Sequence, residues 1–145
     1  MAEPKVQSFR NHTKLDPLFH FLILPVAMIT VLVAAYQITQ RQTLADAWFF
    51  ILSVATLLAF LKIRTYSLKV QDRVIRLEET VRMQRLLPPG LQSRINELTE
   101  GQFVALRFAP DAELTGLVEQ TLANNWSNKE IKSKIVNWRP DFFRV

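Results

Sequence analysis

The apolar positions of the chain fall into two long stretches. Residues 18–38 (LFHFLILPVAMITVLVAAYQI) form the first and residues 44–63 (LADAWFFILSVATLLAFLKI) form the second. From Val26 to Leu87 there is neither a proline nor a glycine. A helix of about 20 residues is about 30 Å long, which matches the hydrocarbon thickness of a bilayer. The pattern therefore predicts two transmembrane helices, 18–38 and 44–63, joined as an antiparallel hairpin by a short external loop, 39–43.

The start of the first predicted helix has clear local determinants. Asp16 is a good N-cap residue, and Pro17 suits the first helical position because its missing N–H needs no partner there. Pro25 comes about two turns later. Inside a helix it either introduces a kink or leaves a carbonyl without its usual donor.

Small residues four apart occur in both predicted spans. Thr30 and Ala34 form the pair in the first, and Ala55 and Ala59 form the pair in the second. Such spacing allows two helix backbones to approach closely. We expect these pairs to pack the two helices of one hairpin together, and an interface between two copies is the alternative.

A polar helical pattern follows the second span over residues 64–87 and stops at Pro88 and Pro89. We predict a basic amphipathic helix here, either continuous with the span or bent at the membrane interface. Its apolar stripe has a 4, 3, 4 spacing and consists of Val70, Val74, Leu77 and Val81. We expect this stripe to pack on the protein's own last domain, and a coiled coil is the alternative.

Residues 88–145 predict a small helical domain. Thr99 with Gln102 and Ser127 with Glu130 have the spacing of capping boxes, and Pro110 precedes another helical segment that starts at Asp111. We expect an aromatic core from Phe103, Phe108, Trp126, Trp138, Phe142 and Phe143. A domain of this size is marginally stable alone, so it should pack on the basic helix or on a partner.

The basic residues near the spans predict the orientation of the chain. Arg41 is the one basic residue in the connecting loop, whereas eight flank the other span ends: Lys5, Arg10, Lys14, Lys62, Arg64, Lys69, Arg73 and Arg76. Under the positive-inside rule both ends face the cytoplasm, and residues 1–17 form a cytoplasmic N-terminal segment. The net charge of +5 is then largely a topology signal.

The sequence offers little material for catalysis or metal binding. There is no cysteine, and the three glycines are isolated, so neither thiol chemistry nor a phosphate-binding loop is predicted. Of the two histidines, His20 lies inside a span, four residues after Asp16. It is a candidate haem ligand or proton relay, and its alternative role is an interfacial imidazole bonded to Asp16 or to headgroups. We expect no catalytic residue, no metal site and no cofactor.

The basic helix supplies the candidate contact residues. We expect anionic lipid headgroups to be the first partner and an acidic protein subunit the second. Nucleic acid is not expected, because acidic residues are interspersed and no series of stacking aromatics is interleaved with the basic residues. The segment SNKEIKSKI resembles the opening helix of some helix-turn-helix regulators, but RPDFFRV follows it in place of a recognition helix. The candidate lipid or partner contacts are Lys62, Arg64, Lys69, Arg73, Arg76, Arg82 and Arg85.

Three blocks of sequence carry a family resemblance. They are NHTKLDPLFHF at 11–21, VQDRVIRLEE at 70–79 and IKSKIVNWRPDFFRV at 131–145. Together they resemble an uncharacterised bacterial family of small membrane proteins known only as a domain of unknown function. The resemblance implies a bacterial cytoplasmic membrane and two spans, and it brings no catalytic residues.

These observations predict an all-α protein, built from a membrane-spanning helical hairpin, a long basic amphipathic helix and a small helical cytoplasmic domain. We expect a non-enzymatic accessory or scaffold subunit of a bacterial inner-membrane complex. Its partners would be other membrane subunits and anionic headgroups, with a homo-oligomer also open. The alternatives are a membrane-bound redox or proton-handling subunit that uses His20, and a membrane-tethered nucleic-acid-binding regulator.

Overall fold

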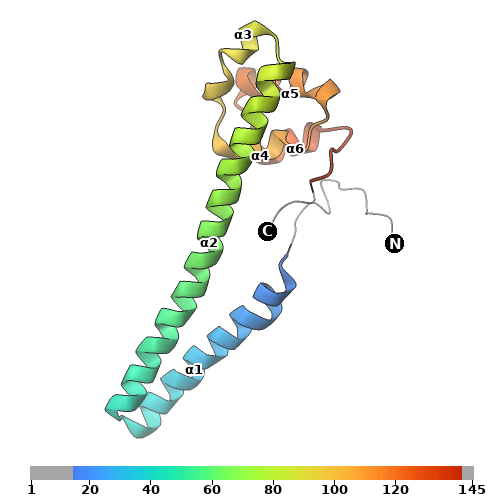
Figure 1. Ribbon diagram of the computed structural model, residues 1–145. Coiled ribbons are helices and arrows are strands. Elements are labelled where there is room, and N and C mark those ends of the chain that lie inside the picture. Colours follow the sequence, from blue (N-terminus) through green and yellow to red (C-terminus); the bar gives the residue numbers. More distant parts are fainter. Residues whose placement is uncertain (1–14, 142–145) are drawn as a thin grey trace. The chain divides into compact units, whose positions relative to one another are not determined.

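The computed structural model describes residues 15–141; residues 1–14 and 142–145 lie outside the described part (Figure 1). The described residues are helical and contain no strand, so the all-α prediction is confirmed. They divide into two compact units, residues 15–68 and residues 69–141. We call the first the hairpin unit and the second the helical unit. The dividing point falls inside one long helix, so each unit contains part of it.

The hairpin unit begins with a π-helical turn, η1 (Phe19–Ile23), which continues into α1 (Leu24–Arg41). The Asp16 carboxylate accepts a hydrogen bond from the Phe19 N–H at 3.2 Å, so the predicted cap is confirmed. The π-helical turn ends two residues before Pro25, which lacks the N–H that an α-helix would use at that position. A local change to i→i+5 bonding is a known way for a helix to accommodate such a defect.

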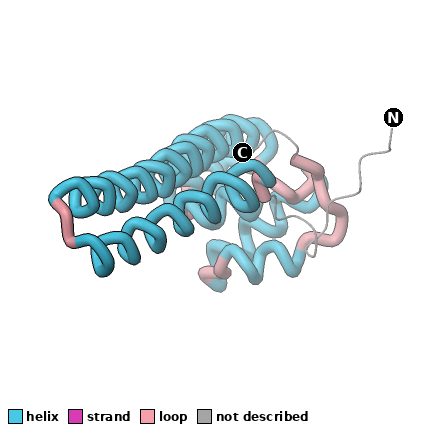
Figure 2. The backbone as a smooth tube through the Cα atoms, turned by 90° about the horizontal axis from the view of Figure 1, so that it is seen from below, coloured by secondary structure: helices cyan, strands magenta, loops and turns pink. Residues whose placement is uncertain are grey.

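Only two residues, Gln42 and Thr43, separate α1 from α2 (Leu44–Leu86), so the loop is shorter than the predicted 39–43 (Figure 2). Gln42 adopts the left-handed conformation, with φ of 52°, and its N–H donates to the Ile38 carbonyl at 3.1 Å. The Thr43 hydroxyl accepts from the Asp46 N–H at 3.1 Å and donates to the Asp46 carboxylate at 2.6 Å. These contacts end one helix and start the next within a single tight turn.

By length and composition, both long helices are apolar enough to cross a membrane: Phe19–Arg41 and Leu44–Leu86. The buried residues of the hairpin unit are small or polar, namely Ala27, Ala34, Asp46 and Ser53. Ala34 is therefore buried as its small-residue spacing predicted. Ala55 and Ala59 are exposed, so the predicted packing through that second pair is wrong. Within the hairpin unit, the buried residues of α2 are Asp46 and Ser53, which lie near its start and close to the two-residue turn.

The helical unit contains the end of α2 and five short elements: α3 (Pro89–Gln92), η2 (Ile95–Glu97), α4 (Glu100–Leu106), α5 (Asp111–Asn124) and α6 (Asn128–Lys134). α2 ends just before Pro88 and Pro89, as predicted. Both predicted capping boxes are present, at the starts of α4 and α6, and α5 begins at Asp111 with Pro110 as its N-cap. The helix that follows the Ser127 capping box ends at Lys134, since Ile135 is extended.

The core of the helical unit includes Met83 of α2 and Leu87, which directly follows α2. Met83 and Leu87 are buried in one cluster with Phe103 and Phe108, which confirms that the last domain packs on the basic helix. Trp126 and Trp138 are partly buried against this cluster. Two other aromatic residues predicted for the core, Phe142 and Phe143, lie outside the described residues.

The face of α2 that packs on the helical unit differs from the predicted one. The stripe of Val70, Val74, Leu77 and Val81 is exposed, so the expectation that it packs on the last domain is wrong. The buried positions are instead Ile75, Glu79 and Met83, each four residues after the previous one, and Leu87 continues this row just after the helix ends. The sequence pattern did not predict this row as the buried one, because Glu79 interrupts its series of apolar residues.

Candidate functional site

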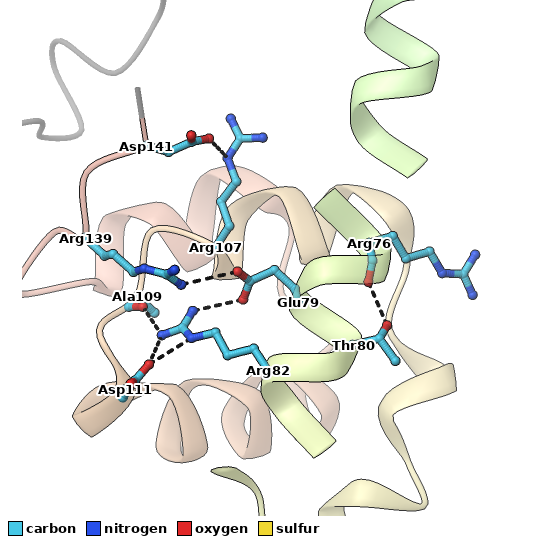
Figure 3. Close-up of polar contacts among 9 residues, drawn as sticks. All are labelled: Arg76, Glu79, Thr80, Arg82, Arg107, Ala109, Asp111, Arg139 and Asp141. Carbon is cyan, nitrogen blue, oxygen red and sulfur yellow. Dashed lines mark hydrogen bonds and ion pairs between the residues drawn. The ribbon is translucent and has the colours of Figure 1, made fainter. Parts of the chain in front are cut away.

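A group of charged residues surrounds Glu79 where the end of α2 packs on the rest of the helical unit (Figure 3). We call it the Glu79 cluster. Its members are Glu79, Arg82, Arg107, Asp111, Arg139 and Asp141. Glu79 is only 5% exposed, and its carboxylate accepts hydrogen bonds from Arg82 at 2.9 Å and from Arg139 at 3.5 Å. Because an isolated buried carboxylate is costly, these two guanidinium groups make its burial possible.

Arg82 connects α2 to the beginning of α5. Its Nε and Nη2 donate to the Asp111 carboxylate at 2.8 and 2.6 Å, and Nη2 also donates to the Ala109 carbonyl at 2.7 Å. Together with the bond to Glu79, these contacts use the planar donor fork of the guanidinium in three directions. Arg82 therefore stabilises the helical unit itself.

The segment after α6 covers the other side of the Glu79 cluster. The Arg139 N–H donates to the Phe108 carbonyl at 2.8 Å, and the Trp138 ring lies 5.0 Å from the Phe108 ring. Arg107 pairs with Asp141 at 3.2 Å, and its guanidinium lies 4.6 Å from the centre of the Phe108 ring. The segment is thus fixed by ring contacts and charge pairs rather than by a helix.

The electrostatics of this region are dominated by burial. Desolvation raises the pKa of Glu79 above its ordinary value of 4.5, and the charge and hydrogen bond of Arg82 and the charge of Arg139 only partly oppose it. The pKa of Asp72 is also raised, first by burial and then by the nearby Glu100 carboxylate. The cluster combines three arginines with three carboxylates, so it is a neutral network suited to holding helices together.

The sequence-predicted contact residues do not form one site. Lys62, Lys69, Arg73, Arg76 and Arg85 are exposed along α2, and Arg64 is half-buried. Several of them lie over aromatic rings: Lys62 is 5.7 Å from the Tyr66 ring centre, Arg64 is 5.8 Å from that of Phe19, and Arg76 is 5.7 Å from that of Phe103. Arg82 differs from the rest because the Glu79 cluster already uses its guanidinium.

His20 lies in the first turns of the hairpin unit. Its Nδ1 is 2.8 Å from the Asp16 carbonyl oxygen, so the ring donates to the backbone and not to the Asp16 carboxylate. The Phe19 ring contacts it edge-on at 5.2 Å. Within residues 15–141 no three potential metal-binding side chains of the His, Cys, Asp and Glu type come together.

The hairpin unit also has an apolar groove of about 460 Å³ between its helices. It is lined by α1 and α2 residues such as Val26, Phe49 and Phe60. The groove wall also carries the hydroxyl groups of Thr30 and Thr56, but each of these donates to a backbone carbonyl of its own helix at 2.8 Å. The groove therefore offers an apolar surface, which suits an acyl chain or another apolar helix.

Comparison with known protein families gives a match over residues 1–145 to a family of unknown function, DUF6526. The chain belongs to this DUF6526 family. No curated protein and no solved structure shows significant similarity to it. The DUF6526 match confirms that the chain is a member of an uncharacterised family, and it assigns no activity to any residue.

Of the Glu79 cluster in this DUF6526 member, only Arg82 is among the sequence-predicted contact residues. The sequence pattern did not predict the other five members: Glu79, Arg107, Asp111, Arg139 and Asp141. Glu79 is bonded to Arg139, which is 60 positions later in the chain, and no local pattern links the two. One clue was present, because Glu79 occupies the row of Ile75, Met83 and Leu87, where a charge is unexpected. When the apolar residues of such a row are buried, the charged residue among them is buried too, and it then needs an oppositely charged partner.

The Glu113 carboxylate holds the segment that follows α6. Its carboxylate accepts from the N–H groups of Val136 and Asn137, each at 2.9 Å, and from the Asn137 side chain at 2.8 Å. Desolvation raises the pKa of Glu113, but these hydrogen bonds outweigh it and hold the pKa below 4.5. The contact is therefore complete above pH 4.5 and is lost as the pH falls through the lowered value.

Glu113→Gln removes this charge, and we expect hydrogen exchange at Val136 and Asn137 to become about fivefold faster at pH 7, in keeping with the loss of charge-assisted hydrogen bonds. The measurement is amide exchange by mass spectrometry on the full chain in detergent. Glu119→Gln, on an exposed position of the same helix, is the matched control. Equal exchange in both variants would show that Glu113 does not hold this segment.

Proposed function

We propose that the protein is an integral membrane protein whose hairpin unit inserts into the bilayer and whose helical unit works as a docking domain on the cytoplasmic side. In this proposal it is a non-enzymatic accessory or scaffold subunit of a bacterial inner-membrane complex. Its contacts are with other membrane subunits and with anionic headgroups.

The outward direction of the large apolar side chains in the hairpin unit carries the proposal. Many of these side chains are exposed, including Phe21, Leu22, Ile29, Leu32, Trp48, Ile51, Leu52 and Leu58. A soluble protein rarely exposes a contiguous apolar surface of more than a few hundred Å². In lipid the same surface is the favoured one, and the helical backbone satisfies its own hydrogen bonds.

The charges next to the second span support the inward orientation. Lys62, Arg64 and Lys69 lie where α2 changes from apolar to polar sequence, and Lys62 and Lys69 are exposed. Each basic residue near an anionic leaflet contributes about 1 kcal/mol of attraction. On the other side of the hairpin, Arg41 is the only basic residue near the turn.

The helical unit supports a docking role more than a chemical one. Its buried charged residues, Glu79 and Arg107, belong to the Glu79 cluster, whose members pair with one another and balance in charge. Around it the α2 surface presents exposed basic side chains such as Arg73 and Arg76. An acidic surface on another subunit would complement them.

Membrane insertion is tested by alkaline carbonate extraction of native membranes. We expect the chain to stay in the membrane pellet, and its release into the supernatant would contradict insertion. Protease added outside intact cells should leave the helical unit uncut. Cleavage from outside would reverse the proposed orientation.

The accessory role is tested by mild-detergent purification of the tagged chain from its own membranes, followed by mass spectrometry. We expect other membrane proteins to copurify, and Arg76→Glu to reduce their recovery several-fold by reversing the docking charge. Lys129→Glu makes the same charge change at an exposed position of α6 and should have no effect. Recovery of this chain alone would rule out the accessory role.

A further inference from the structure

Within the helical unit, α2 has two apolar faces, and the described residues of its own domain cover only one of them. The covered face contains Ile75 and Met83. The other face contains the open seam, which we define as Val70, Val74, Leu77 and Val81. Their exposed fractions are 60%, 48%, 66% and 39%. At 100° per residue, the open seam lies about 180° around the helix from the covered face.

The spacing and residue types of the open seam fit a particular helical partner. The 4, 3, 4 spacing is that of alternating a and d positions in a heptad repeat. Val74 and Val81 then occupy a positions, and Val70 and Leu77 occupy d positions. β-Branched residues at a together with leucine at d favour a parallel, two-stranded coiled coil; Val74, Val81 and Leu77 follow this rule, whereas Val70 places a β-branched residue at d.

The charges beside the open seam complement a second copy of the same helix. In this register Arg73 is a g residue and Glu78 is the following e residue, and both are exposed. In a parallel pair each g residue faces the next e residue of the other helix. Arg73 of one copy would therefore meet Glu78 of the other, twice by symmetry, and the next such pair, Thr80 with Arg85, brings no like charges together.

We propose that the open seam is a homodimer interface, on which a second copy of this chain docks in parallel. The inference rests on the proposed function, because two heptads are short for a coiled coil in water. Two hairpins inserted in one membrane with the same orientation bring their seams together at high effective concentration and in parallel. The covered face stays with each copy's own helical unit.

Disulfide crosslinking tests this directly, because the chain has no cysteine of its own. Val74→Cys and Leu77→Cys are made separately in the full chain and oxidised mildly in native membranes. We expect each to give a disulfide-linked dimer, whereas Arg76→Cys, exposed on α2 but outside the seam, should crosslink at least tenfold less. Cysteines whose Cα atoms are more than about 7 Å apart cannot be bridged.

The charge pair provides a second, independent test in the Leu77→Cys chain. Arg73→Glu and Glu78→Arg should each reduce dimer formation several-fold, and the two changes in one chain should restore it. Equal crosslinking at position 76, or crosslinking of the seam to a different protein, would overturn the proposal. So would the absence of dimer, which is also the result expected if another part of the same chain covers the seam. Carbonate extraction of the same samples shows separately whether membrane insertion holds.

Discussion

Arg82→Met is expected to destabilise the helical unit by about 3–5 kcal/mol, the cost found when one partner of a buried ion pair is removed. The substitution keeps most of the side-chain volume and removes the donors. Among the described residues, it leaves the Glu79 carboxylate, which is 5% exposed, with only the long 3.5 Å contact to Arg139. It also removes the donor to the Ala109 carbonyl, directly before α5.

The measurement is chemical unfolding of the full chain in detergent, followed by tryptophan fluorescence in a Trp48→Phe background. The remaining tryptophans, Trp126 and Trp138, pack on the core of the helical unit and report its unfolding. Arg85→Met is the matched control, since Arg85 is exposed three residues later on the same helix. A loss below about 1 kcal/mol for Arg82→Met would show that the Glu79 cluster contributes little to stability.

Substituting Glu79 instead of Arg82 shows how much each of the two charged residues contributes to stability. Burial raises the pKa of Glu79, so its ionised form is disfavoured in the folded unit, and its effect on stability becomes more favourable as the pH falls from that raised value toward 4.5. Glu79→Gln is therefore expected to cost only about 1 kcal/mol at pH 7, since Arg82 keeps Asp111 as its partner. Glu79→Leu combined with Arg82→Met should recover part of the loss caused by Arg82→Met alone, because no unpaired charge remains buried.

Local chemistry explains which parts of the fold were predictable. The ends of the helices follow from residues within a few positions of each other, as with the Thr99 and Ser127 capping boxes and the stop at Pro88. These contacts join residues only a few positions apart, so they can be predicted from the local sequence without knowledge of the tertiary fold. The π-helical turn before Pro25 belongs to the same group, since a proline predicts a defect there without specifying its form.

The choice of packed face could not be obtained in this way. Two rows on α2 are compatible with burial, and the more apolar one, the open seam, is the one left exposed. Glu79 made the other row appear polar, and its partner Arg139 lies 60 positions away. Whether a charged position can be buried depends on such distant partners, which helical periodicity does not contain. For the same reason the Glu79 cluster could not be predicted. The exposed basic residues of α2 could be predicted from the sequence, because they need no distant partner.

An arginine on the outward face of α1 should distinguish a lipid environment from water. Leu32 is 67% exposed. If water surrounds it, Leu32→Arg is a surface substitution worth within about 0.5 kcal/mol. If the bilayer surrounds it, the change costs about 3–4 kcal/mol of insertion free energy at mid-span, and adding Ile29→Arg on the same side increases that cost. We expect the lipid result, measured as the ratio of carbonate-resistant to released chain, which should fall about a hundredfold or more.

Val136→Arg is the matched control for this prediction. Val136 is 80% exposed in the helical unit, and its side chain is apolar like that of Leu32. The same charge introduced there should leave membrane retention unchanged, because that unit is proposed to lie in water. If Leu32→Arg and Val136→Arg behave alike, the apolar surface of the hairpin unit does not face lipid. It would then have to be covered by protein, and the groove between α1 and α2 would be the first place to look for the covering helix.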